Sequence, residues 1–394
     1  MKKESLEKFY IGIISLFILN FSYQMMLSMN QSEDFIGFSY VISVILLFFS
    51  IIIYLFVKFR DFFYINNKII NTIGALIFGV LFVSVFIPTG LSTKDLSIQT
   101  IKIIIPLLAF VCFFIVFSQN NIEVFYLKIA ALCTIMLVYF YYVEYQLTYS
   151  LIDNEFASLN ISYFPFLMLP TLLCFDNKRL KTFFVAIIAI TIFSSFKRGG
   201  LIAFFLSITV YYTVEYLFVI SNNQKITKLM YVFLIIALIV FIFFIYDSSS
   251  GGYFWERLMM LNEDEGSGRI DVYKEIILII ENTSLSDFIF GHGHDAVFRS
   301  TTQSLSAHND FLEIFYDYGI LIFGIYINLH IQLVKTAISL VKSKSRFASP
   351  FAMSYTQFLF LSLVSSVFIY PYFIFLTTFW AMVIGVTKRE TVYL

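Results

Sequence analysis

Long runs of apolar residues constrain the fold of this chain more than any other feature. A helix that crosses the hydrocarbon core of a bilayer needs about 20 such residues. Only 13% of the 394 residues are charged, whereas soluble proteins carry about 25%. The sequence therefore predicts an all-α, polytopic integral membrane protein with about 12 transmembrane helices. The apolar segments span residues 7–27, 35–57, 69–87, 100–118, 122–145, 158–175, 180–196, 199–220, 226–246, 309–341, 349–369 and 371–388.

The distribution of lysine and arginine predicts which side of the membrane each connection faces. With a cytoplasmic N-terminus, 18 of the 26 basic residues fall at the cytoplasmic ends of the predicted helices and 8 fall on the outer side. Basic residues accumulate on the cytoplasmic side of membrane proteins, so both termini are expected to be cytoplasmic. The formal net charge of zero gives no indication of a nucleic-acid partner.

One connection between apolar segments is long and polar, and on this orientation it is periplasmic. We expect transmembrane helices 1–9 in residues 1–246, the periplasmic loop in 247–307 and helices 10–12 in 308–394. Within the loop, Val272 and Ile276, followed by two further isoleucines, recur at helical spacing. This pattern predicts a short amphipathic helix that packs on the membrane surface or on the bundle.

A group of candidate functional residues lies where the loop enters the tenth apolar segment. His308 and Asn309 stand at this junction, and on a continuous helix Gly319 shares a face with His308. Gly319 would then allow close approach of a neighbouring helix. A histidine, with an unperturbed pKa near 6.5, suits general-base removal of a proton from a hydroxyl group. An interfacial histidine that caps the helix fits the same residues.

Basic residues on the outer side are candidates for binding an anion. Arg198 follows a helix end in SSFKRGG (194–200), and its planar guanidinium suits bidentate contact with phosphate. Gly199 and Gly200 would leave backbone N–H groups free at the start of the next helix. Arg269 opens the amphipathic helix of the loop. The alternatives are a tight turn with interfacial basic residues at Arg198 and an ordinary surface arginine at Arg269.

A metal site is a further possibility that the spacing does not favour. His292, His294, Asp295 and His308 are ligand types that zinc accepts, but no HExxH spacing places two histidines on one helix. The glycines beside His292 and His294 predict an exposed turn. We therefore expect no metal.

Three ionisable residues of the tenth apolar segment have separate expectations. Glu313 and Asp317 are functional candidates because ionisable groups at membrane depth are costly, although Asp317 would face away from His308 and is expected to be structural. His330 lies about 33 Å from His308 on a straight helix, at ~1.5 Å per residue. That separation would exclude it from the same site.

Several short motifs together resemble the superfamily of O-antigen ligases and repeat-unit polymerases. They are SSFKRGG (194–200), GSGR (266–269), GHG (291–293) and AHNDFLEIFYDYG (307–319). The last matches the family's His-x10-Gly pattern with His308 and Gly319. Members of this family have about a dozen helices and one large periplasmic loop before this histidine, as expected here from hydropathy.

The resemblance implies a metal-independent, inverting membrane glycosyltransferase that needs no cofactor. Its donor is an oligosaccharide on undecaprenyl pyrophosphate. Arg198 and Arg269 match arginines that hold the pyrophosphate, and His308 matches the residue that activates the acceptor hydroxyl. Asn309, Gly199, Gly200 and Gly319 would support them. The expected location is the bacterial inner membrane, with membrane lipids as partners and a chain-length regulator and a flippase as candidate partners.

The favoured function is polymerisation of lipid-linked O-antigen or capsule repeat units. The alternative within the family is ligation of the finished glycan to lipid A-core. An alternative of another class is a flippase or transporter of lipid-linked oligosaccharides, and a non-catalytic assembly scaffold is a third. Transporters usually show internal repeats and charges near the membrane midplane. The polar residues here gather at the outer side, which favours glycosyl transfer.

Overall fold

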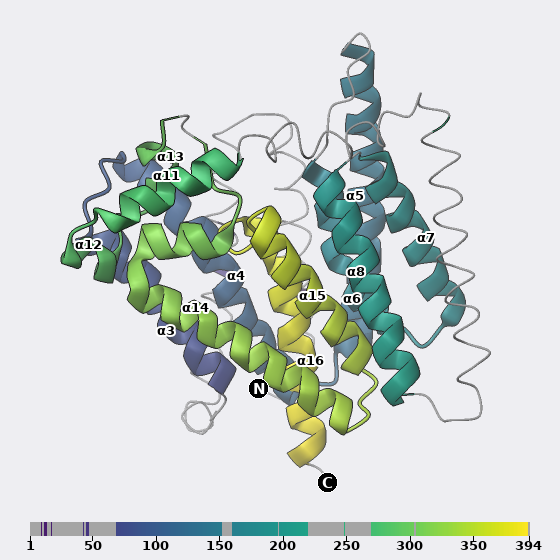
Figure 1. Ribbon diagram of the computed structural model, residues 1–394. Coiled ribbons are helices and arrows are strands. Elements are labelled where there is room, and N and C mark those ends of the chain that lie inside the picture. The colour runs from purple at the N-terminus through teal and green to yellow at the C-terminus, as the bar shows by residue number, and fades with distance from the viewer. Residues whose placement is uncertain are drawn as a thin grey trace.

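The computed structural model describes residues 68–151, 160–195, 197–219, 269–302 and 305–392, together with single positions at 9, 12, 13, 17, 42, 45, 46 and 248. These residues form helices, and no strand occurs among them (Figure 1). The long helices form a bundle, and three short ones gather at one end of it. The bundle helices are α3 (Lys68–Phe86), α4 (Thr93–Gln119), α5 (Glu123–Leu151), α6 (Tyr163–Leu172), α7 (Lys178–Ser194), α8 (Arg198–Val214), α14 (Asp310–Lys342), α15 (Ala348–Val364) and α16 (Ile374–Val392).

Nine of the predicted apolar segments coincide with these bundle helices. The predicted segments 7–27, 35–57 and 226–246 lie outside the continuously described ranges. Within the described residues, six helices are long and apolar enough to cross a membrane, judged by length and composition. In α3, α4, α5, α8, α14 and α16, these spans are Lys68–Phe86, Thr93–Gln119, Glu123–Gln146, Arg198–Phe218, Asp310–Lys342 and Pro371–Glu390.

The centre of the bundle is built from α4 and α16, which pack against each other along their length. Hydrogen bonds between helices join the buried polar side chains there. The Trp380 indole N–H donates to the Ser354 hydroxyl at 2.9 Å, and the Tyr126 hydroxyl donates to Thr378 at 3.0 Å. Such bonds stabilise a membrane protein because lipid offers a polar group no other partner.

The three short helices cover one end of the bundle, and we call residues 269–302 the cap. They are α11 (Arg269–Glu281), α12 (Leu285–Phe290) and α13 (Ala296–Ser300). Val272 and Ile276 of α11 are buried in a small cluster with Val297, Ala307 and Tyr316. The apolar stripe that predicted an amphipathic helix thus packs on the first part of α14, and Figure 1 shows α11 lying across that end.

Helix α14 is interrupted by a sharp kink at Gly319. The backbone there has φ 74° and ψ 175°, a region that is essentially restricted to glycine. Figure 1 shows the first segment of α14 lying across the top of the bundle and the second descending along it. The expectation of one continuous helix over 309–341 is therefore wrong, because the chain turns at Gly319 after about two and a half helical turns.

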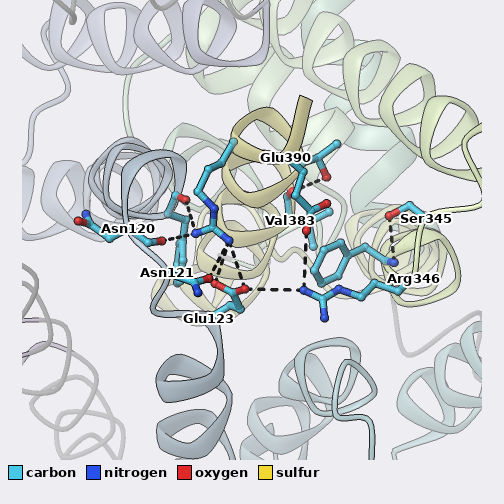
Figure 2. A network of polar contacts seen from close by, with 11 residues as sticks. Asn120, Asn121, Glu123, Ser345, Arg346, Val383 and Glu390 are labelled. Atoms are coloured by element: carbon cyan, nitrogen blue, oxygen red, sulfur yellow. Dashed lines mark hydrogen bonds and ion pairs between the residues drawn. The ribbon is translucent and has the colours of Figure 1, made fainter. Parts of the chain in front are cut away.

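At the opposite end of the bundle, a polar network holds two connections and the end of α16 together. Arg389 near the end of α16 donates to both carboxylate oxygens of Glu123 at 3.2 Å and to the Asn121 side chain at 3.1 Å. It also donates to the backbone carbonyl of Asn120. Arg346 approaches the same glutamate at 3.7 Å, from the connection between α14 and α15 (Figure 2). Because the Arg389 and Glu123 side chains are only 12% and 13% exposed, solvent screens this pair weakly.

We predict that Arg389→Met destabilises the protein by about 2–3 kcal/mol, because it leaves the carboxylate of Glu123 with one remaining, more distant cation in a largely buried place. The measurement is thermal unfolding of the detergent-purified protein. Lys342→Met, at an exposed lysine of the same end, is the control and should leave the melting temperature unchanged. Equal melting temperatures for both variants would contradict the role given to Arg389.

We also predict that Gly319→Ala destabilises by about 2–3 kcal/mol, since a side chain is strained in this backbone region. A Cβ there would lie 2.6 Å from the backbone nitrogen of Gly291. The matched control is Gly324→Ala on the same helix, where a Cβ meets nothing within 4 Å. This control should be neutral or stabilise by up to about 1 kcal/mol. An alanine tolerated equally at both positions would argue against the kink.

Candidate functional site

His308 lies in the turn before α14 rather than on the helix. Its backbone is left-handed, with φ 51°, a conformation uncommon for residues other than glycine. Asn309 is the N-cap of α14, and its side-chain oxygen accepts hydrogen bonds from the N–H groups of Phe311 at 3.0 Å and Leu312 at 3.2 Å. The expectation that His308 and Gly319 share one helical face is wrong, because the helix starts after the first residue and kinks at the second.

The carboxylate of Glu313 holds the turn that contains His308. Its Oε1 accepts the backbone N–H of His308 at 3.0 Å and also the hydroxyl of Ser306. Glu313 is 3% exposed and belongs to the first helical turn after the Asn309 cap. Buried hydrogen bonds are costly to break because water cannot replace them, so Glu313 fixes the backbone from which the His308 imidazole projects.

The kink in α14 is joined to the GHG turn through backbone hydrogen bonds. The N–H groups of His292 and Gly293 donate to the carbonyls of Tyr316 and Asp317 at 3.1 and 2.8 Å. A helix that ends at Gly319 leaves its last carbonyls without partners inside the helix, and the GHG turn supplies them. Gly291 has φ 81°, and a Cβ there would lie 2.6 Å from the Gly319 nitrogen. The GHG turn and the kink at Gly319 therefore form one structural unit.

Arg198 is the first residue of α8 and is partly buried. The first intrahelical bond runs from the Leu201 N–H to the Lys197 carbonyl at 3.0 Å. The N–H groups of Arg198, Gly199 and Gly200 precede that bond, as expected for the first turn of a helix. A helix N-terminus with an arginine in its first turn favours negatively charged ligands.

The segment that follows α15 connects the Arg198 turn with the start of α14. Gly199 lies against Val364 at the end of α15. A few residues later, the N–H groups of Val367 and Phe368 both donate to the Asp310 carboxylate at 2.9 Å. Arg198 and the His308 turn therefore border the same connecting segment, at the same end of the bundle.

Arg269 is the first residue of α11. In Figure 1, α11 lies at the end of the bundle where α14 begins, and it leads outward to α12. The start of α11 therefore lies at the same end of the bundle as Arg198 and His308.

The histidines of the GHGH turn have structural environments. His292 is partly buried, and its ring stacks on Tyr316 with centroids 4.2 Å apart. His294 is buried, which corrects the expected exposed turn. One of its ring nitrogens lies 2.6 Å from the Ser84 hydroxyl and the other 2.7 Å from the Tyr318 hydroxyl. Burial, with a smaller contribution from Arg299, lowers the pKa of His294 to about 4, so its imidazole is neutral at physiological pH.

His330 lies closer to the candidate site than a straight helix would allow. Its ring stacks between Phe358, at 4.7 Å between centroids, and Phe311, at 5.2 Å. Phe311 is only three residues beyond His308. The estimate of about 33 Å assumed a straight helix at ~1.5 Å per residue, and the kink at Gly319 invalidates it. His330 is nevertheless enclosed by aromatic rings, with both ring nitrogens buried.

A cavity of about 310 Å³ lies beside the His308 turn. Ser306 and Glu313, which hold that turn, are part of its wall. Other parts of the chain contribute polar side chains to it: Gln99 and Lys102 from α4, Asp295 from the cap, and Tyr370 from the segment after α15. Within the described ranges, no group of three or more His, Cys, Asp or Glu side chains is arranged to hold a metal ion.

Comparison with known families identifies the part of the chain that carries this geometry. A family model described as O-antigen ligase matches residues 183–327. This match supports membership of the O-antigen ligase and polymerase superfamily. A search of curated proteins gave no match. The O-antigen ligase domain starts within α7 and ends shortly after the kink in α14, so it contains every site residue expected from the sequence.

Members of the matched family are membrane glycosyltransferase-like enzymes, and the long apolar helices of this chain agree with a membrane protein. The match gives no support to the flippase alternative. Sequence reasoning missed the link between Glu313 and His308, because the turn geometry that brings them together has no signature in the residue order. It also missed Lys102, for which the available signal was a lysine inside an apolar segment.

Proposed function

We propose that this protein polymerises oligosaccharide repeat units carried on undecaprenyl pyrophosphate, at the periplasmic face of the inner membrane. The observation that carries the proposal is the position of His308. It stands in a rigid turn beside a polar cavity, within the matched domain and at the same end of the bundle as Arg198. That end of the bundle is the outer side on the charge-based orientation.

In the proposed reaction, His308 acts as the general base. Its imidazole takes the proton of an acceptor hydroxyl, and the hydroxyl oxygen forms a new bond to the anomeric carbon of the donor. The bond between that carbon and the pyrophosphate oxygen breaks. The electron pair leaves with undecaprenyl pyrophosphate, and attack from the opposite side inverts the anomeric centre.

Arg198 and Arg269 are proposed to bind the leaving pyrophosphate. Negative charge grows on the pyrophosphate as the glycosidic bond breaks, so cations held in place there stabilise the transition state more than the ground state. The positive end of the α8 helix dipole would add to this stabilisation. In this proposal His308 removes the proton and the two arginines stabilise the leaving group, so the reaction requires neither a metal ion nor a cofactor.

Ligation of a finished glycan to lipid A-core is the second candidate, because the description of the matched family is O-antigen ligase. The two reactions share the donor chemistry and differ in the acceptor. Deleting the gene distinguishes them. Lipid A-core that carries a single repeat unit indicates a lost polymerase, whereas bare core with accumulated lipid-linked polymer indicates a lost ligase.

We predict that His308→Ala lowers transfer by about 10²- to 10⁴-fold, the usual contribution of a general base. Arg198→Ala should lower it by about 10²- to 10³-fold, through weaker stabilisation of the leaving group. The measurement is chain growth from purified lipid-linked repeat units. Lys274→Ala, an exposed lysine of the cap, is the control with unchanged activity. Wild-type activity in both site variants would refute the proposed roles.

A second prediction separates the positioning role of Glu313 from the chemistry. Glu313→Gln keeps a side-chain oxygen that accepts from the His308 N–H, and we expect a loss of kcat of only about tenfold because this hydrogen bond is retained. Glu313→Leu has no acceptor and should lose about a hundredfold. The pH dependence of the residual activity should keep the histidine limb in both variants. Equal losses in the two variants would show that the hydrogen bond is unimportant.

A further inference from the structure

The cavity beside the His308 turn contains side chains that the proposed reaction does not use. Gln99 and Lys102 from α4, and Tyr370 from the segment after α15, line it together with Asp295 of the cap. Gln99, Lys102 and Tyr370 lie outside the matched O-antigen ligase domain, which covers residues 183–327. The cavity is therefore assembled from the family domain and from parts of the chain that the family match does not describe.

The wall of the cavity offers both hydrogen-bond donors and acceptors. The Gln99 side chain hydrogen-bonds to Asp295. Burial raises the pKa of the Asp295 carboxyl, and the nearby Lys102 charge opposes that effect. An ammonium group donates and a carboxylate accepts, whereas an amide does both. A sugar hydroxyl also donates and accepts, so this mixed wall matches a polyhydroxylated ring.

The balance of charge argues against an anionic ligand in the same place. Three acidic side chains, Asp295, Glu313 and Asp317, line the cavity in the described part of the chain, against the single lysine Lys102. His294 also lines it but is neutral at physiological pH. With one lysine in its lining, the cavity offers too little positive charge to balance a pyrophosphate, which carries several negative charges. An uncharged sugar needs no such balance.

Size and position specify which sugar the cavity would hold. About 310 Å³ is at the lower limit of small-molecule pockets, which suits one sugar ring rather than a whole oligosaccharide. The donor sugar is attached directly to the pyrophosphate, whereas the reacting end of the acceptor is not. Ser306 and Glu313 belong both to the cavity wall and to the hydrogen bonds that fix the His308 turn.

We propose that this cavity is the acceptor subsite, which takes the uncharged terminal sugar of the acceptor glycan, and that Lys102 and Asp295 orient its hydroxyl groups. This inference rests on the proposed glycosyltransferase function. It deepens that function by naming residues that determine acceptor specificity, which lie partly outside the family domain.

Binding of a phosphate-free oligosaccharide tests the subsite directly. The probes are the repeat-unit oligosaccharide, released by mild acid from the lipid-linked pool of the source cells, and the delipidated core oligosaccharide. The full-length protein in nanodiscs is titrated with each probe by calorimetry. We expect at least one probe to bind. Lys102→Met should weaken this binding about tenfold or more, because it removes a charged hydrogen-bond donor. Ile103→Trp, which fills the cavity from its wall, should abolish it.

Matched controls separate cavity effects from misfolding. Lys274→Met and Ile277→Trp make the same replacements at exposed positions of the cap and should bind as the wild type does. His308→Ala should bind the probe but not transfer glycan. Inorganic pyrophosphate should not displace the oligosaccharide. Displacement by pyrophosphate, or wild-type binding by both Lys102→Met and Ile103→Trp, would overturn the subsite.

The outcome for the subsite is distinguishable from the outcome for the proposed function. Probe binding that depends on Lys102, without any glycan transfer by the wild-type protein, would support the cavity as a sugar site and reject the enzyme. Transfer by the wild-type protein that is unchanged in Lys102→Met and Ile103→Trp would support the enzyme and reject this subsite.

Discussion

The pairing between the kinked helix α14 and the GHG turn is the constraint on which the rest of the site depends. The carbonyls of Tyr316 and Asp317 accept the N–H groups of His292 and Gly293, so the helix ends without leaving these carbonyls unpaired. The kink lays the first segment of α14 across the end of the bundle (Figure 1). His308 consequently precedes a short helical segment that lies between the cap and the bundle. It does not lie at the end of a helix that runs along the bundle.

Buried carboxylates join the first segment of α14 to the neighbouring parts of the chain. Asp310 accepts two backbone N–H groups from the segment after α15, Glu313 accepts from the His308 turn, and Asp317 accepts the Val297 N–H of the cap at 3.0 Å. All three carboxylates lie on the short first segment of α14. Acidic side chains near a helix N-terminus are favourable there. Each one joins α14 to a different neighbour, which makes the loops around His308 interdependent.

The sequence predicted those features that depend on local pattern. The KRGG motif predicted a helix start at Arg198, and the spacing of Val272 and Ile276 predicted α11 in the loop. The kink was not predicted, because a single glycine in an apolar run also fits close packing of two helices. The burial of His294 and the stacking of His330 on Phe311 follow from that kink. Lys102 and Asp295 line the same cavity although they are almost two hundred residues apart in the sequence. Only the tertiary fold brings them together, so the sequence could not predict the cavity.

The central claim is that Arg198, Arg269 and His308 act on one substrate. The most direct measurement is an experimental structure of the protein in lipid nanodiscs with undecaprenyl pyrophosphate bound. We expect both guanidinium groups within hydrogen-bond distance of the pyrophosphate, about 3 Å, with the His308 imidazole on the cavity side of it. A pyrophosphate bound at the other end of the bundle, or held without either arginine, would contradict the account.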